Sequence, residues 1–198
     1  MPEFRLVPGA PALKALANDY WETSSEKDKR EEEEAFDAGR AIRDGDRSLE
    51  TLKKIVHWKS PRVVHHLETN DPRKIETALE VAANHTDALK ALKELQELKG
   101  VAIPVASAIL TTIHPERYTI IDFRALEALG HFGHDEEFYI AYLKFCRELS
   151  LTADINEQLD LPGASKLRTL DRALWQWSAS NTKGEKRSAS LRAAGKQD

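Results

Sequence analysis

The chain has 198 residues, 41% hydrophobic and 31% charged, which fits one globular domain, and its net charge of −4 disfavours indiscriminate binding to phosphate backbones. Its one cysteine, Cys146, excludes a disulfide framework, a cysteine-based zinc site and a four-cysteine iron–sulfur cluster within one chain. No apolar run approaches the roughly 20 residues that span a bilayer, and the first residues lack a secretory signal, so we expect a cytoplasmic protein with no membrane partner.

Helical periodicity continues along almost the whole chain, and strand-like alternation with hairpin turns is missing, so the sequence predicts an all-α fold, a compact multi-helix domain. The expected helices span residues 11–22, 26–44, 48–60, 62–68, 72–83, 87–98, 104–113, 122–130, 135–149 and 164–178. We expect three regions: an N-terminal helical cover at 1–47, a main domain at 48–179 and a flexible basic tail at 180–198.

A tight apolar turn joins the helix that ends near Leu98 to the helix that begins near Pro104. From residue 98 the sequence reads L-K-G-V-A-I-P-V-A-S-A-I-L, which is a helix-hairpin-helix pattern. Gly100 can take the positive φ that ends one helix, and Pro104 has the φ that suits the first turn of the next. Exposed amides at the start of a helix can hold a phosphate without reading its base.

This stretch resembles the L-P-G-V-G hairpin of the helix-hairpin-helix (HhH-GPD) superfamily of base-excision DNA glycosylases. In that superfamily a catalytic aspartate follows an I-x-D or V-D element, and here Asp122 ends the run Y-T-I-I-D, 22 positions after Gly100. Lys99 and Ala102 replace the proline and the second glycine of the usual hairpin. The chain therefore resembles a divergent member without an iron–sulfur cluster.

The resemblance implies a DNA glycosylase-like protein that binds duplex DNA through the hairpin and hydrolyses the N-glycosidic bond of a damaged or modified base with Asp122. The residues expected to contact DNA are Lys59, Arg62, Lys99, Gly100, Val101, Ala102, Ile103, Pro104, Val105 and Arg124. The aromatic candidates for the wall of a base pocket are Trp58, Tyr118, Phe123 and Trp175. The resemblance further implies a monovalent cation, K⁺ or Na⁺, on the backbone carbonyls of Gln96, Leu98 and Val101.

Simpler interpretations remain open for each of these features. Asp122 stands where an N-cap is expected, and the aromatic residues can belong to the core. The whole protein can be a noncatalytic DNA-binding module, or a protein-interaction domain whose hairpin is only a turn. If it is an enzyme, we expect a monofunctional glycosylase, because Pro104 occupies the position of the nucleophilic lysine of bifunctional relatives, with Lys99 as the nearest amine.

Overall fold

The computed structural model describes residues 2–132 and 135–194, and every regular element in these ranges is a helix, which confirms the all-α prediction. No helix in these ranges is long and apolar enough to cross a membrane. The helices are η1 (Ala10–Ala12), α1 (Leu13–Thr23), α2 (Glu26–Arg43), α3 (Leu49–Lys59), η2 (Pro61–Val63), α4 (Val64–Leu67), α5 (Pro72–Asn84), α6 (Ala88–Gln96), α7 (Ile103–Ile113), α8 (Phe123–Glu127), α9 (Glu136–Leu151), α10 (Ala153–Gln158) and α11 (Lys166–Ala194).

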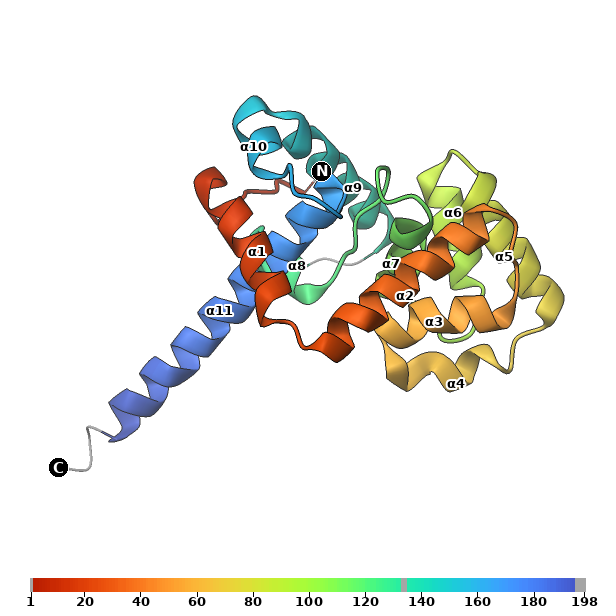
Figure 1. The fold of residues 1–198 in the computed structure, drawn as a ribbon, viewed down its shortest axis with the longest axis horizontal. Helices are drawn as coiled ribbons and strands as arrows, with labels where there is room; N and C mark the ends of the chain where they lie inside the picture. Colours follow the sequence, from red (N-terminus) through yellow and green to blue (C-terminus); the bar gives the residue numbers. More distant parts are fainter. Residues whose placement is uncertain (1, 133–134, 195–198) are drawn as a thin grey trace.

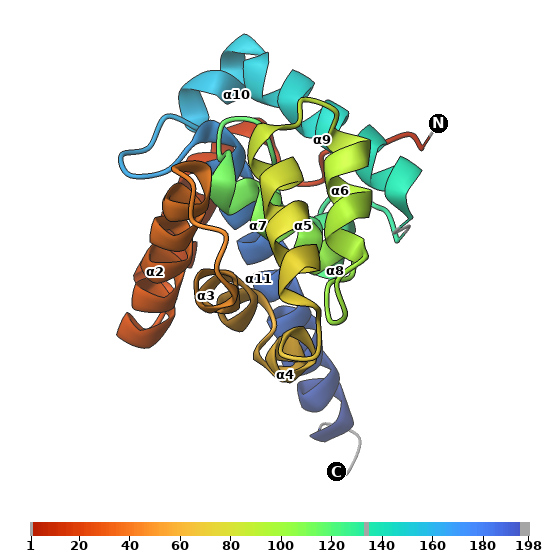
Figure 2. The same ribbon diagram turned by 90° about the vertical axis from the view of Figure 1, so that its right-hand side faces the viewer.

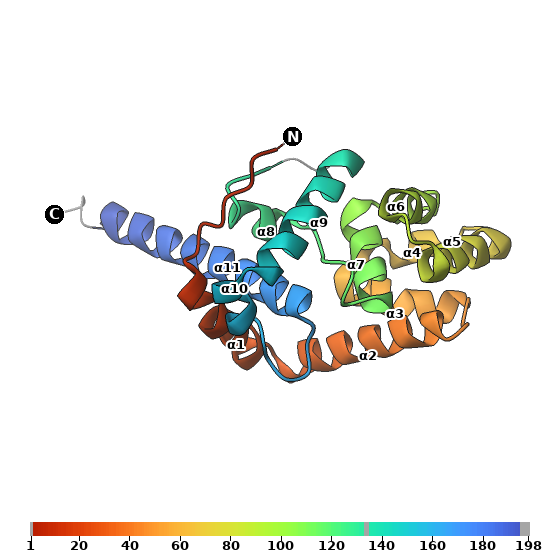
Figure 3. The ribbon, with the colours of Figure 1, turned by 90° about the horizontal axis from the view of Figure 1, so that it is seen from above.

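The helices form two groups (Figure 1), which are joined by packing of α6 against α9 and by side-chain contacts between α2 and α11. One group is α2 to α7, in which α5 and α6 lie side by side (Figure 2). The other contains α1 and α8 to α11, with α1 packed along α11. Viewed from above, α7 lies between α3 and α9, so it stands where the two groups meet (Figure 3). The predicted region 1–47 therefore contributes to both groups, α1 to one and α2 to the other.

The end of the chain differs from the expected helix boundaries. The helix expected at 164–178 continues to Ala194, so the predicted boundary at residue 180 falls inside α11. The final residues of the predicted tail, 195–198, lie outside the described residues. The short helix α10 was not expected, because only Ile155 on it is buried and its sequence carries little apolar periodicity.

Helix α7 is the centre of the core. Ten of its eleven residues are buried, and many are small, which lets neighbouring helices approach closely. One close approach is at Gly39 of α2, where an added Cβ would lie 2.2 Å from the carbonyl oxygen of Thr112. Gly39 is thus needed for space rather than for a special backbone conformation.

We expect Gly39→Ala to destabilise the protein by about 2 kcal/mol, because the overpacking cost between α2 and α7 exceeds the gain in helix propensity. The urea midpoint of unfolding measures the change. Asp37→Ala, at an exposed position on the same helix, is the matched control and should unfold near the parent's midpoint. A parent-like midpoint for Gly39→Ala would mean that α2 and α7 are not in this contact.

Candidate active site

The hairpin between α6 and α7 rests on the segment that contains η2 and α4. Gly100 has φ +89°, and a Cβ there would lie 2.9 Å from the carbonyl oxygen of Val63, so both conformation and space require glycine. Asn70 fixes the turn from the same side: its Oδ1 accepts from the Lys99 amide at 2.8 Å, and its Nδ2 donates to the Lys99 carbonyl at 3.2 Å. No local pattern in the sequence predicts this role for Asn70.

Three backbone amides of the hairpin, those of Gly100, Ala102 and Ile103, donate no hydrogen bond to any described residue. Ala102 is the N-cap of α7, is exposed, and supplies no capping side chain. Among the other residues expected to contact DNA, Val101, Ile103 and Val105 have buried side chains, so only their backbone could meet a ligand.

The carbonyls expected to hold a monovalent cation belong to the same turn. The Leu98 carbonyl accepts from the Val101 amide at 3.0 Å, which leaves one lone pair for a cation. The side-chain Oε1 of Gln96 is buried and has no hydrogen-bond partner. The Nε2 of the same side chain donates to Glu136 on α9 at 3.1 Å, so this oxygen is distinct from the backbone carbonyls expected to hold the ion. The chemistry described below does not depend on a cation.

Asp122 follows an extended segment that three side chains hold in place. Tyr139 and Tyr142, fully buried on α9, donate from their hydroxyls to the carbonyls of Thr119 at 3.1 Å and Ile120 at 2.9 Å. The Ile121 amide donates to Ser107 Oγ on α7 at 3.2 Å. The backbone that leads to Asp122 is therefore tied to α7 and to α9 at once.

The two oxygens of Asp122 have different partners. Oδ1 accepts from the amides of Arg124 at 3.1 Å and Ala125 at 3.0 Å, so the aspartate does cap α8. Oδ2 lies 3.1 Å from Nζ of Lys59, which stands at the end of α3. Capping uses only one oxygen, so the N-cap role and a chemical role for the carboxylate are compatible.

The environment keeps Asp122 ionised. Burial pushes the pKa of its carboxyl upward, but the charge of Lys59 and the two α8 amides outweigh burial and hold that pKa below its usual value. Both side chains are mostly shielded, with 18% of Asp122 and 17% of Lys59 exposed. The carboxylate is thus an anion that can act on a neighbouring cation or on a water molecule.

Asp122 and Lys59 line a cavity of about 460 Å³ that four aromatic side chains share. The four are Tyr20, Trp21, Trp58 and Trp175. Two of the aromatic candidates from the sequence, Trp58 and Trp175, are therefore on this cavity. The other two are elsewhere: Tyr118 is fully buried, and Phe123 is 69% exposed.

Arg124 contacts one exposed aromatic ring and one that lines the cavity. Its guanidinium lies between the rings of Phe123, 5.0 Å away, and Trp175, 4.9 Å away. Its Nη1 donates to Ser178 Oγ at 3.4 Å. Of the other expected DNA contacts, Arg62 and Lys99 are exposed on η2 and the hairpin. The structure thus gives one cluster around Asp122 and another around the hairpin.

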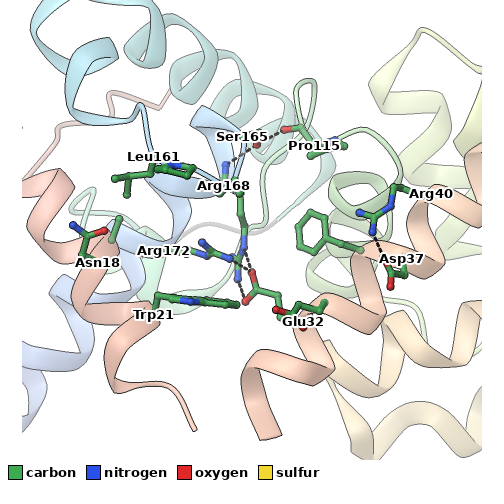
Figure 4. Close-up of a pocket in the computed structure, with 16 residues that line it drawn as sticks. Asn18, Trp21, Glu32, Asp37, Arg40, Pro115, Leu161, Ser165, Arg168 and Arg172 are labelled. Carbon is green, nitrogen blue, oxygen red and sulfur yellow. Dashed lines mark hydrogen bonds and ion pairs between the residues drawn. The ribbon is translucent and has the colours of Figure 1, made fainter. Parts of the chain in front are cut away.

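A buried ionic cluster forms one side of the cavity. The carboxylate of Glu32, on α2, accepts three hydrogen bonds: from Arg168 Nε at 2.9 Å, from Arg168 Nη2 at 2.6 Å and from Arg172 Nη2 at 2.7 Å. The two arginines converge on Glu32 beside Trp21 (Figure 4). Burial opposes ionisation of Glu32, but these two cations lower the pKa of its carboxyl to about 2. Arg168 also contacts Asp171, the next acid on α11.

A larger cavity, about 780 Å³, lies on the other side of this cluster and shares Trp21, Glu32 and Arg168 with the first (Figure 4). Size alone would favour it as the site. The most buried carboxylate of the larger cavity is Glu32, whose charge is already neutralised by two arginines. In the smaller cavity, Oδ2 of the Asp122 carboxylate contacts Lys59 alone among the described residues. We therefore take the smaller cavity as the candidate site.

Comparison of the chain with protein-family models, with curated proteins and with solved structures finds no match.

Proposed function

We propose that this protein is a DNA glycosylase that binds duplex DNA through the α6–α7 hairpin and hydrolyses the N-glycosidic bond of a damaged or modified base. The observation that carries the proposal is the ionised Asp122 in a cavity walled by tryptophans, placed after a hairpin whose amides are unbonded. The sequence resemblance and this geometry agree on the same residue.

The proposed chemistry needs an extrahelical base, because a base stacked inside duplex DNA cannot reach the cavity. Trp58 and Trp175 supply aromatic walls, with Arg168 over the first ring at 5.3 Å and Arg124 over the second at 4.9 Å, and the cavity is within the size range of small-molecule sites. As the bond to the base breaks, the deoxyribose becomes cationic, and the Asp122 carboxylate stabilises that charge. The same carboxylate can then deprotonate the water that adds to C1′.

Incubation of the protein with a panel of duplexes that each carry one damaged or modified base tests the proposal. Alkali then cleaves any abasic site that base release has left. We expect cleavage at one or a few of the modified positions and none in the unmodified duplex. Binding without cleavage across the panel would favour the noncatalytic DNA-binding module instead.

The hairpin's role in DNA binding predicts opposite effects of one substitution on stability and on affinity. Ala102→Asp supplies the missing N-cap and should stabilise the fold by about 1 kcal/mol. The added carboxylate should repel a phosphate at the unbonded amides and lower duplex affinity at least about tenfold at low salt. Fluorescence anisotropy with a labelled duplex measures the affinity.

Ala102→Ser is the matched control, since serine caps the helix without adding charge. It should gain stability and keep the parent's affinity. Because Ala102→Asp is expected to be more stable than the parent, unfolding cannot explain its loss of binding. Parent-like affinity in Ala102→Asp would mean that the hairpin does not contact phosphate.

Lys59 bears on whether the enzyme also cleaves the strand. The lysine position of bifunctional relatives holds Pro104, but the structure brings Lys59 Nζ to 3.1 Å from Asp122 Oδ2 in the cavity. In this contact Nζ is engaged with the carboxylate and is not free to attack C1′. We therefore keep hydrolysis as the proposed reaction, with Lys59 positioning the carboxylate.

Borohydride reduction during turnover should accordingly yield no covalent protein–DNA adduct, because only a Schiff base between an amine and the sugar is trapped in this way. An adduct would contradict the monofunctional assignment. Its loss in Lys59→Gln but not in Lys99→Gln would then identify Lys59 as the amine, and the reverse pattern would identify Lys99.

A further inference from the structure

Several other carboxyl groups line the cavity of Asp122, and Asp171 is one of them. Asp171, on α11, is only 3% exposed, and its side chain borders the same space as Asp122, Lys59 and Trp175. One oxygen, Oδ2, accepts from Nη1 of Arg168, and the other has no hydrogen-bond partner among the described residues. Three further acidic residues line the cavity, but Asp28 is exposed, Glu31 pairs with Lys27 and Glu32 pairs with two arginines. Asp171 is therefore the buried carboxyl group of the cavity, besides Asp122, that keeps an oxygen without a partner among the described residues.

The arginine beside Asp171 is shared with a stronger partner. Glu32 takes two contacts from Arg168, at 2.9 and 2.6 Å, and Arg172 adds its charge to Glu32 rather than to Asp171. Burial therefore dominates at Asp171 and raises the pKa of its carboxyl to about 6, although Arg168 opposes the rise. The nearby negative charge of Asp122 acts in the same direction as burial.

Groups from every surrounding helix face Asp171. They are Arg168 on α11, Glu32 on α2, Lys59 on α3, Asp122 at the start of α8, Tyr20 on α1, and Tyr139, Tyr142 and Cys146 on α9. The tyrosines and the cysteine are neutral near pH 6, because burial raises the pKa of each. The charged neighbours are thus two cations and two anions, and Asp171 is the group whose protonation changes near neutral pH.

We propose that Asp171 is the acid of this cavity, which donates its proton to a ring nitrogen of the departing base while Asp122 acts on the sugar. The proposal rests on the proposed function and adds a second catalytic residue to it. Its basis is the contrast between two of the carboxyl groups that line one cavity: Asp122 contacts a lysine and two amides, whereas Asp171 shares an arginine with Glu32 and has one oxygen without a hydrogen-bond partner among the described residues. Such a pair suits acid and base roles in one reaction.

The step balances without any further reactant. The bond between C1′ and the base nitrogen breaks with its electron pair going to the base, and the proton of Asp171 moves to the base, which leaves neutral. Water adds to C1′, and Asp122 takes its proton. Asp171 ends as a carboxylate beside Arg168, and exchange with solvent returns the proton from Asp122 to Asp171.

Binding of a free base tests the acid directly, without requiring turnover. We expect free adenine to quench tryptophan fluorescence in the cavity and to bind the parent at least about tenfold more weakly at about pH 8 than at about pH 5, as the donor proton is lost. Asp171→Asn should bind with no such dependence, because an amide donates at every pH. Asp154→Asn, an exposed aspartate on α10, is the matched control and should behave as the parent does.

Adenine affinity of the parent that does not change with pH overturns the acid role, whatever the variants do. A base that is already cationic in the nucleotide becomes neutral when it takes the bond's electron pair and needs no proton. Asp171→Asn should therefore release 7-methylguanine at a rate near the parent's but an uncharged purine about a hundredfold more slowly. Equal losses for both bases would also overturn it.

The two proposals fail separately. If the parent excises a base but binds adenine equally well at every pH, Asp171 is not the acid, and the glycosylase proposal is unaffected. If adenine binding weakens as the pH rises only when Asp171 is present, and no duplex is excised, Asp171 is a proton donor to a bound base and the protein is not a glycosylase.

Discussion

Asp122→Asn is expected to reduce base excision at least about a thousandfold, because the variant has no anion to stabilise the cationic sugar. The fold should survive, since an asparagine side-chain oxygen can still accept from the Arg124 and Ala125 amides that Asp122 caps. DNA affinity should be retained, because the substitution removes a negative charge. Single-turnover release from the best duplex of the panel measures the loss.

The matched control is Asp135→Asn. Asp135 caps α9 by accepting from the Phe138 amide at 2.7 Å and does not line the cavity. The control should excise as the parent does, so a general effect of losing a capping carboxylate is separated from chemistry. Excision by Asp122→Asn within a few fold of the parent would exclude Asp122 as the catalytic group.

Glu32→Ala is expected to destabilise the protein by about 3–5 kcal/mol at neutral pH, because it leaves Arg168 and Arg172 buried beside no counter-charge on α2. The free energy of unfolding from urea titration measures this. Glu33→Ala changes the exposed neighbour on the same helix and should cost little. A small effect of Glu32→Ala would mean that the cluster is not formed.

The same cluster predicts a pH dependence of stability. The pKa of Glu32 falls from 4.5 in the unfolded chain to about 2 in the folded protein, so its ionisation stabilises the fold by about 3 kcal/mol. Because the folded pKa is the lower one, the contribution is complete above pH 4.5 and is lost as the pH falls towards 2. Stability of Glu32→Gln should therefore fall less over that interval than stability of the parent.

Local signals in the sequence were enough for most of the helices. Helices were expected to begin at residues 48, 72 and 87. In the structure Ser48, Asp71 and Asp87 each accept a backbone hydrogen bond as the N-cap of these helices. Gly100 was expected to take positive φ and does so. These features depend on a few neighbouring residues, which is why periodicity and capping could locate them.

The candidate site could be predicted only in part, because its contacts join distant segments. Lys59 and Asp122 are 63 residues apart, and Arg168 and Glu32 are 136 apart, so no local pattern pairs them. Glu32 belongs to a run of four glutamates that is typical of a solvent-exposed helix face, so composition alone did not single it out. The signal that could have found it is its place on the buried stripe with Ala35 and Ile42, at helical spacing.

The most direct test of the central claim uses a duplex in which a cationic pyrrolidine replaces one deoxyribose, since this ring imitates the charged sugar of the transition state. We expect the parent to bind it at least about a hundredfold more tightly than the same duplex with an uncharged tetrahydrofuran. Asp122→Asn should lose that preference. Equal affinity of the parent for the two duplexes would contradict the assignment of Asp122 as the group that stabilises the sugar cation.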